Sequence, residues 1–117
     1  MTDRRVARLD RRAGRRAPFV AAVRTARPGQ RDQVQLALAR NLGEDGMELC
    51  RAPSGDWGAR TRVALAFELP DGGEIVEVRG AVVFERAEGR WRSTGVRFEG
   101  ISAVDRARIA RYLDAIA

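Results

Sequence analysis

The sequence contains no lysine and no histidine, and its single cysteine is Cys50. The usual general base and the commonest zinc ligand are therefore missing, and an intramolecular disulfide is impossible. No apolar run approaches the roughly 20 residues of a membrane span. The N-terminus has arginines but no apolar segment typical of a secretory signal. We therefore expect a cytoplasmic protein without enzyme activity, metal or cofactor.

The net positive charge of the chain comes entirely from its N-terminal quarter. All 22 basic residues are arginine, which codon bias in a GC-rich genome would explain. Codon bias does not explain how the arginines are distributed. Residues 1–31 carry a net charge of +8, and residues 32–117 a net charge of −2. Charge concentrated on a terminal segment indicates an anionic partner for that segment.

The 117 residues are enough for one domain with a modest core. Residues 1–17 are charged and lack apolar periodicity, so we expect a flexible basic arm there. Pro18 then marks entry into extended chain, and we expect residues 18–117 to form the folded unit.

Alternating apolar residues predict short antiparallel strands separated by turns every eight to twelve residues. They lie around Phe19–Val23, Val34–Leu38, Met47–Cys50, Val63–Leu69, Val76–Phe84 and Val96–Phe98. The alternation of Val34, Leu36 and Leu38 with Gln and Ala predicts a half-buried strand. Gly80 and the stretch near Gly95 are predicted bulges.

The C-terminus changes to helical spacing. Ser102 begins a capping-box-like segment, in which Asp105, three residues later, takes the place of the usual Glu or Gln. An apolar stripe follows, which we expect to face the core: Val104, Ile109, Tyr112, Leu113 and Ile116. The predicted fold is mainly β, an antiparallel barrel with a C-terminal helix across it or its mouth.

In the order of these features the chain resembles the PilZ domain family of bacterial receptors for cyclic di-GMP. The resemblance covers about residues 10–116 and implies a barrel of about six strands. The segments that carry the resemblance are, in order, the Arg cluster 11–16, Asn41-Leu42-Gly43-Glu44-Asp45-Gly46, Leu69-Pro70-Asp71-Gly72, the Val-rich strand from Gly80, and Gly95-Val96-Arg97-Phe98.

The family's first motif is Arg, three residues, then Arg. It fits Arg11 with Arg15 or Arg12 with Arg16, and we prefer the second pair because Arg16 precedes Ala17-Pro18-Phe19. Arg11 is then an additional guanidinium. The resemblance implies that these arginines bind the ligand together with Asn41, Gly43 and Gly46. The sequence leaves open whether one ligand or an intercalated pair of ligands binds.

Arginine suits such a ligand because its planar fork pairs with phosphate oxygens or guanine O6 and N7, and stacks on bases. Asn41 can donate and accept, and we expect Gly46 to adopt positive φ. Gly43 stands where the family has Ser. One neutral hydrogen bond contributes roughly 0.5–1.5 kcal/mol, about tenfold in affinity at most, so we expect weakened rather than abolished binding.

Other residue groups have simpler interpretations. Trp57 and Trp91 can stack on a base, although packing at a barrel end is the commoner role. Cys50 is expected to be a small buried side chain, and Glu44 and Asp45 to be solvated. Gly72-Gly73 belongs to a hairpin-like turn and not to a phosphate loop.

Three functions follow, in this order. The first is a cyclic di-GMP receptor whose arm closes over the ligand and relays the signal to an unidentified effector protein. The second is a ligand-independent PilZ adaptor, which the departure at Gly43 favours. The third is nucleic-acid binding, for which the arm lacks interleaved aromatic residues.

Overall fold

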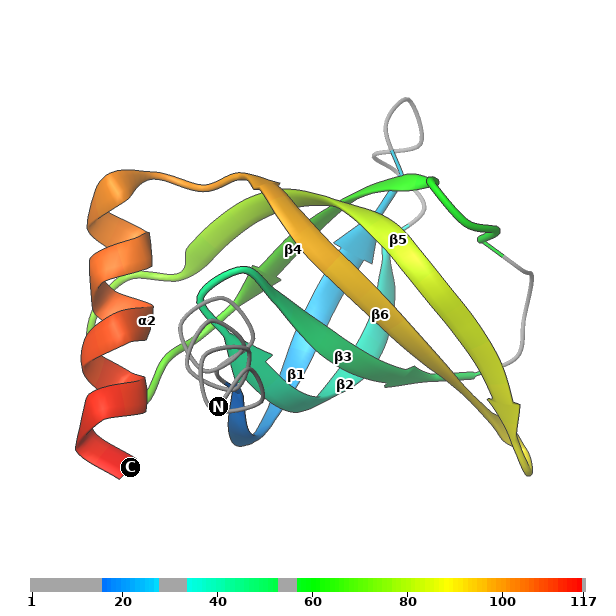
Figure 1. The fold of residues 1–117 in the computed structure, drawn as a ribbon, viewed down its shortest axis with the longest axis horizontal. Coiled ribbons are helices and arrows are strands. Elements are labelled where there is room, and N and C mark those ends of the chain that lie inside the picture. Colours follow the sequence, from blue (N-terminus) through cyan, green and yellow to red (C-terminus); the bar gives the residue numbers. More distant parts are fainter. Residues whose placement is uncertain (1–15, 28–33, 53–56, 117) are drawn as a thin grey trace, which may run out of the picture.

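The computed structural model describes residues 16–27, 34–52 and 57–116. It contains six strands and a helix, shown in Figure 1: β1 (Arg16–Ala26), β2 (Gln35–Gly43), β3 (Gly46–Arg51), β4 (Arg62–Phe67), β5 (Val76–Glu88), β6 (Trp91–Gly100) and α2 (Ala103–Ile116). β1 begins two residues before Pro18, because Arg16 and Ala17 already pair with the end of β2.

The six strands form a closed antiparallel barrel in the order β1-β2-β3-β6-β5-β4. The predicted mainly-β barrel with a C-terminal helix is therefore confirmed. β1 pairs with β4 only over Arg24–Ala26, whereas β5 and β6 pair over most of their length. The narrow β1–β4 contact completes the closure, so no strand among the described residues remains as a free sheet edge.

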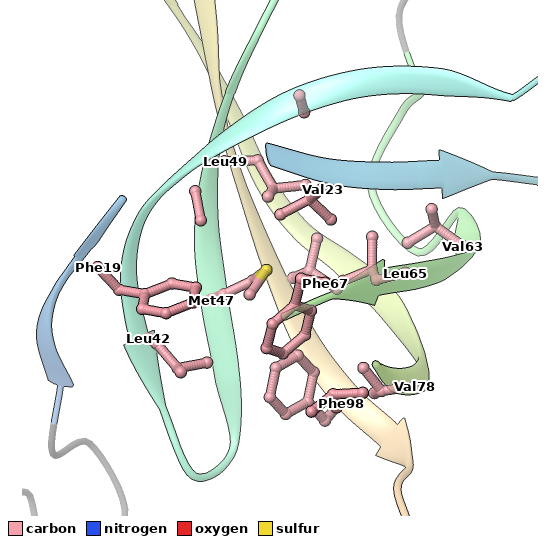
Figure 2. Packing of buried hydrophobic residues seen from close by; sticks show 14 of the residues in the cluster. Phe19, Val23, Leu42, Met47, Leu49, Val63, Leu65, Phe67, Val78 and Phe98 are labelled. Carbon is pink, nitrogen blue, oxygen red and sulfur yellow. The ribbon is translucent and has the colours of Figure 1, made fainter. Parts of the chain in front are cut away.

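Large aliphatic and aromatic side chains fill the barrel (Figure 2). Val63, Leu65 and Phe67 face inward from β4, as their alternation predicted. Met47 and Leu49 meet them from β3 without solvent exposure, and the Phe19 and Phe67 rings stand 5.9 Å apart, edge to face. Edge-to-face pairs of this kind add to the stabilisation from buried area.

The wall formed by β2 has the opposite orientation from the one predicted. Ala37 and Ala39 face the interior, while Val34, Leu36 and Leu38 are exposed. The register pairs Ala22 with Leu38 and Arg24 with Leu36, so the apolar exterior continues onto β1, where Val20 is 84% exposed. Beside Ala37 and Ala39, large residues from the facing strands fill the interior, whereas Leu42, farther along β2, is itself buried.

The helix α2 lies across one end of the barrel (Figure 1). Ser102 caps it, since the Asp105 backbone N–H donates to Ser102 Oγ at 3.0 Å. Ile109 and Leu113 are buried, and Tyr112 donates its hydroxyl to the Pro18 carbonyl at 3.2 Å. Val104 and Ile116 are exposed instead of facing the core, because only the middle of the helix reaches the barrel end.

Both predicted bulges are present in the β5–β6 ladder. The register shifts between Arg79 and Gly80, and again between Val82 and Phe84. A Cβ on Gly95 would overlap the Phe84 ring, and one on Gly80 would lie 2.6 Å from the Arg97 carbonyl oxygen. The glycines therefore permit close approach of two strands that bend around the barrel.

An ion pair is buried in the part of the barrel near the end of β3. Arg51, 3% exposed, pairs with Glu85 of β5 and stacks 3.9 Å above the Trp57 ring. Glu85 also accepts hydrogen bonds from Thr94 and from the backbone N–H groups of Trp57 and Gly58. Trp57 thus packs within the fold, as the simpler interpretation predicted.

Candidate functional site

Two residues from different predicted motifs meet on the outer surface of the barrel. Arg16 begins β1, and Asn41 lies near the end of β2. The Arg16 Nη1 group donates to Asn41 Oδ1 at 3.0 Å, and the register places Arg16 opposite Gly43. The antiparallel pairing of β1 and β2 therefore brings the second arginine of the preferred Arg pair to the glycine turn.

A third residue, which the sequence analysis did not single out, completes the contact. The Asn41 amide Nδ2 donates to Glu48 Oε1 at 2.9 Å, from β2 to β3. Ser93 of β6 donates its hydroxyl to Glu48 Oε2. The pairing of Asn41 with Glu48 follows from the β2–β3 hairpin register, in which a shift occurs between Ala39 and Asn41. No spacing rule in the sequence announces that shift.

Glu48 remains ionised at neutral pH. The Ser93 hydrogen bond is the main cause that lowers the pKa of its carboxyl, and partial burial opposes it. The Asn41 hydrogen bond and the charges of Arg40 and Arg86 lower the pKa further. Arg86 Nη2 lies 3.8 Å from Glu48 Oε2, and Arg40 pairs with Glu88 at 2.8 Å. The outer surface of β2, β3 and β5 therefore carries a mixed but largely balanced set of charges.

The two glycines of the turn differ in what the structure shows. Gly46 lacks the positive φ expected of it; among the described glycines only Gly58, Gly72 and Gly89 have one. A Cβ on Gly46 would instead collide with the Val96 carbonyl oxygen of β6. Glycine is needed there because two backbones approach closely. Gly43 is buried opposite Arg16.

The turn is also attached to the helix. Arg106 of α2 pairs with Asp45 at 3.2 Å, and the Phe98 backbone N–H donates to the Asp45 carbonyl at 2.7 Å. The expectation that Asp45 is merely solvated is therefore wrong. The residues between Asn41 and Gly46 are held from two sides, by β6 and by α2.

The remaining candidates fall outside this cluster. Arg11, Arg12 and Arg15 lie outside the described residues. Cys50 is half-buried, and Trp91 is exposed at the start of β6. In the described part of the chain, no group of three or more His, Cys, Asp or Glu residues is placed to hold a metal ion. No helix there is long and apolar enough to cross a membrane.

The chemistry of the cluster suits a polar, anionic ligand at the surface. The Arg16 guanidinium is exposed and keeps further N–H donors beyond the one given to Asn41. Asn41 retains a second N–H and a second carbonyl lone pair. An arginine held at a fixed position can offer its planar fork to phosphate or to a base edge.

The fold first defines a class, a closed antiparallel barrel of six strands with a terminal helix across one end. The family profile of the PilZ domain matches residues 10–115. The chain belongs to the PilZ domain family, as the resemblance indicated. PilZ domains are typically ligand-binding or adaptor domains without catalytic activity.

Solved structures show the same fold at low sequence identity. The Bacillus subtilis inhibitor of motility, MotI/DgrA, is 16% identical with a TM-score of 0.76; the match covers 86% of this chain and 48% of that one. This chain thus spans about half of that protein's length. A search of curated proteins found no match.

Two isolated PilZ domains match over most of their own length. The PilZ domain of CeSA, from a cellulose-synthesizing bacterium, is 14% identical with a TM-score of 0.64, covering 86% of this chain and 96% of that one. The PilZ domain of YcgR from Escherichia coli, solved with c-di-GMP, is 14% identical with a TM-score of 0.64, covering 86% of each chain.

Proposed function

We propose that this PilZ domain binds cyclic di-GMP through its N-terminal arginines and the Asn41–Gly46 turn, and passes the signal to a partner protein. The observation that carries the proposal is the 3.0 Å contact between Arg16 and Asn41. It joins residues of both expected motifs, which lie 25 positions apart. The structure of the related YcgR domain with c-di-GMP adds support for the ligand class.

The Arg16–Asn41 contact favours the register Arg12 with Arg16 over Arg11 with Arg15. Arg16 belongs to β1 and stands at the turn, so the first arginine of the pair would be Arg12. Arg11 would then supply a further guanidinium. Charge-assisted contacts from several arginines would offset the entropy lost when the N-terminal residues order around the ligand.

Gly43 weakens this site without removing its main contacts. The ligand would lose one side-chain hydrogen bond, worth roughly 0.5–1.5 kcal/mol. The arginine contacts carry charge and are about twice as strong as a neutral hydrogen bond. We therefore expect the affinity to be at most about tenfold lower than that of the same site with Ser at position 43.

Calorimetric titration of the full chain with cyclic di-GMP at low salt tests the proposal. We expect saturable heat, most of which Arg16→Ala removes. Arg62→Ala is the matched control, because it deletes another exposed arginine, from β4, and should leave binding unchanged. Absence of binding heat at high-micromolar cyclic di-GMP would refute the proposal.

A second candidate is a PilZ adaptor that works by protein contact alone, which the glycine at position 43 favours. It predicts partner binding that is indifferent both to cyclic di-GMP and to Arg16→Ala. Nucleic-acid binding ranks third and predicts a steep loss of affinity with salt and little sequence preference.

A further inference from the structure

The side-chain amide of Asn41 stands between two groups of opposite hydrogen-bonding character. On one side is the Arg16 guanidinium, which only donates, and on the other the ionised Glu48 carboxylate, which only accepts. Only one orientation of the amide satisfies both neighbours, with Oδ1 toward Arg16 and Nδ2 toward Glu48. The chemistry of the neighbours therefore determines the orientation of Asn41.

Glu48 is itself firmly placed. It occupies the middle of β3, between β2 and β6, and its side chain is 19% exposed. The Ser93 hydroxyl holds one carboxylate oxygen and Asn41 the other. A chain of hydrogen bonds thus runs from Ser93 through Glu48 and Asn41 to Arg16, across four neighbouring strands of the barrel.

We propose that Glu48 is a positioning residue, which orients the Asn41 amide and through it holds the Arg16 guanidinium ready for an anionic guanine nucleotide. The proposal rests on the proposed function for the identity of the ligand. The effect is preorganisation: an exposed arginine loses side-chain freedom before binding, so less is lost when the ligand arrives.

The carboxylate charge does not oppose this role. Arg40 and Arg86 act on Glu48 electrostatically from either side. The acceptor oxygen, and not the negative charge, is what Asn41 needs. An isosteric amide at position 48 can still accept from Asn41 and donate to the Ser93 hydroxyl, whereas a leucine can do neither.

The first experiment compares Glu48→Leu and Glu48→Gln with the full-length wild-type chain. For E48L we expect cyclic di-GMP affinity to fall about tenfold, and for E48Q to stay within about threefold of wild type. Glu88→Leu is the control, because it removes a carboxylate from the same outer surface without touching Asn41. Wild-type affinity in E48L, or an equal loss in E48Q, would overturn the proposal.

The second experiment needs no ligand and so separates this proposal from the proposed function. NMR of the free protein should show distinct side-chain signals for the Asn41 amide and the Arg16 guanidinium in wild type, E48Q and E88L. Both should lose dispersion and protection from hydrogen exchange in E48L. If wild type binds no cyclic di-GMP, the proposed function fails and these signals alone decide the role of Glu48. Unchanged signals in E48L would refute it.

A third experiment does not require E48L to fold, because it exchanges the hydrogen-bond donor and acceptor between positions 41 and 48. Asn41→Asp places two carboxylates face to face and should weaken binding and shift the Arg16 signals. The double variant N41D/E48Q restores one donor and one acceptor with the roles reversed, and Arg16 keeps an acceptor. We expect it to recover affinity to within about threefold of wild type. A double variant no better than N41D would contradict the proposal.

Discussion

At Gly46 a single missing carbon atom lets two strands approach. Gly46→Ala would push a Cβ into the Val96 carbonyl oxygen of β6, and backbone on both sides must then shift. We expect a loss of about 1–3 kcal/mol in the free energy of unfolding, measured by urea denaturation. Gly100→Ala is the control, because its Cβ would meet only the Arg79 side chain, at 3.4 Å or more. Equal stability of G46A and wild type would contradict the close approach.

Replacement of Arg51 tests how much the buried Arg51–Glu85 ion pair contributes to stability. Arg51→Ala leaves the Glu85 carboxylate partly buried without its main cation, and it removes the guanidinium from the Trp57 ring. We expect about 3–5 kcal/mol of destabilisation, read from chemical denaturation. Arg86→Ala removes an exposed guanidinium from the residue that follows Glu85 in β5, and it should cost far less. Similar losses for the two variants would refute the importance of the buried pair.

At the scale of elements, α2 is tethered to the loop between β4 and β5. Arg108 donates to both carboxylate oxygens of Asp71, each at 3.0 Å. These hydrogen bonds, helped by the Gly73 backbone N–H, lower the pKa of Asp71 from 3.8 to about 2. Because the pKa is lower in the folded state, the stabilisation is complete above pH 3.8 and disappears as the pH falls toward 2.

Asp71→Asn should therefore lower thermal stability at neutral pH, and the difference from wild type should shrink between pH 4 and pH 2. Circular dichroism melts across that range measure it. Glu74→Gln is the control, because Glu74 is exposed in the same loop and has no ion pair within the described residues. A difference that stays constant with pH would rule out the Asp71–Arg108 tether as its origin.

The β2 strand shows how packing reverses an apparent pattern. Leu36 is 69% exposed and Ala37 is 6% exposed. Leu36→Ser should change the free energy of unfolding by less than about 0.5 kcal/mol, whereas Ala37→Leu should cost about 1–3 kcal/mol by overfilling the core. Denaturant titration compares them. A large loss in L36S would place Leu36 in the core after all.

At the scale of the whole molecule, the segment before the barrel is basic: residues 1–15 hold six arginines and two aspartates, a net charge of +4. The first described strand starts at Arg16, and its pairing partners all belong to β2 and β4. A chain starting at residue 16 should keep the barrel, with a melting temperature within a few degrees of that of the full chain. It should lose most cyclic di-GMP binding, because Arg11 and Arg12 are gone. Retained binding would show that the arm contributes nothing to the site.

Local patterns predicted much of the fold because they reflect local physics. The alternation of Val63, Leu65 and Phe67 and the cap at Ser102 follow from strand and helix periodicity, and both are confirmed. The pattern failed at Leu36 and Leu38, where side-chain volume across the barrel decided which face turned inward. It failed again at Val104 and Ile116, because α2 meets the barrel only near its middle.

The candidate site divides in the same way. Arg16 and Asn41 are visible in the sequence as polar residues beside a strand start and a glycine turn. Glu48 is not, because its role depends on the β2–β3 register and on Ser93, 45 residues away. The predicted positive φ at Gly46 is wrong because the need for glycine there comes from the backbone of β6, which lies far along the chain.

The amino-acid sequence by itself determined the strand and helix segments, the localisation of charge and the PilZ motifs, because these depend on residue type and near-neighbour spacing. The tertiary structure alone decided which face of β2 is buried, which carboxylate holds Asn41 and which cation neutralises Glu85. These outcomes depend on barrel closure, which sets the register of strands far apart in the chain and the volume left between them.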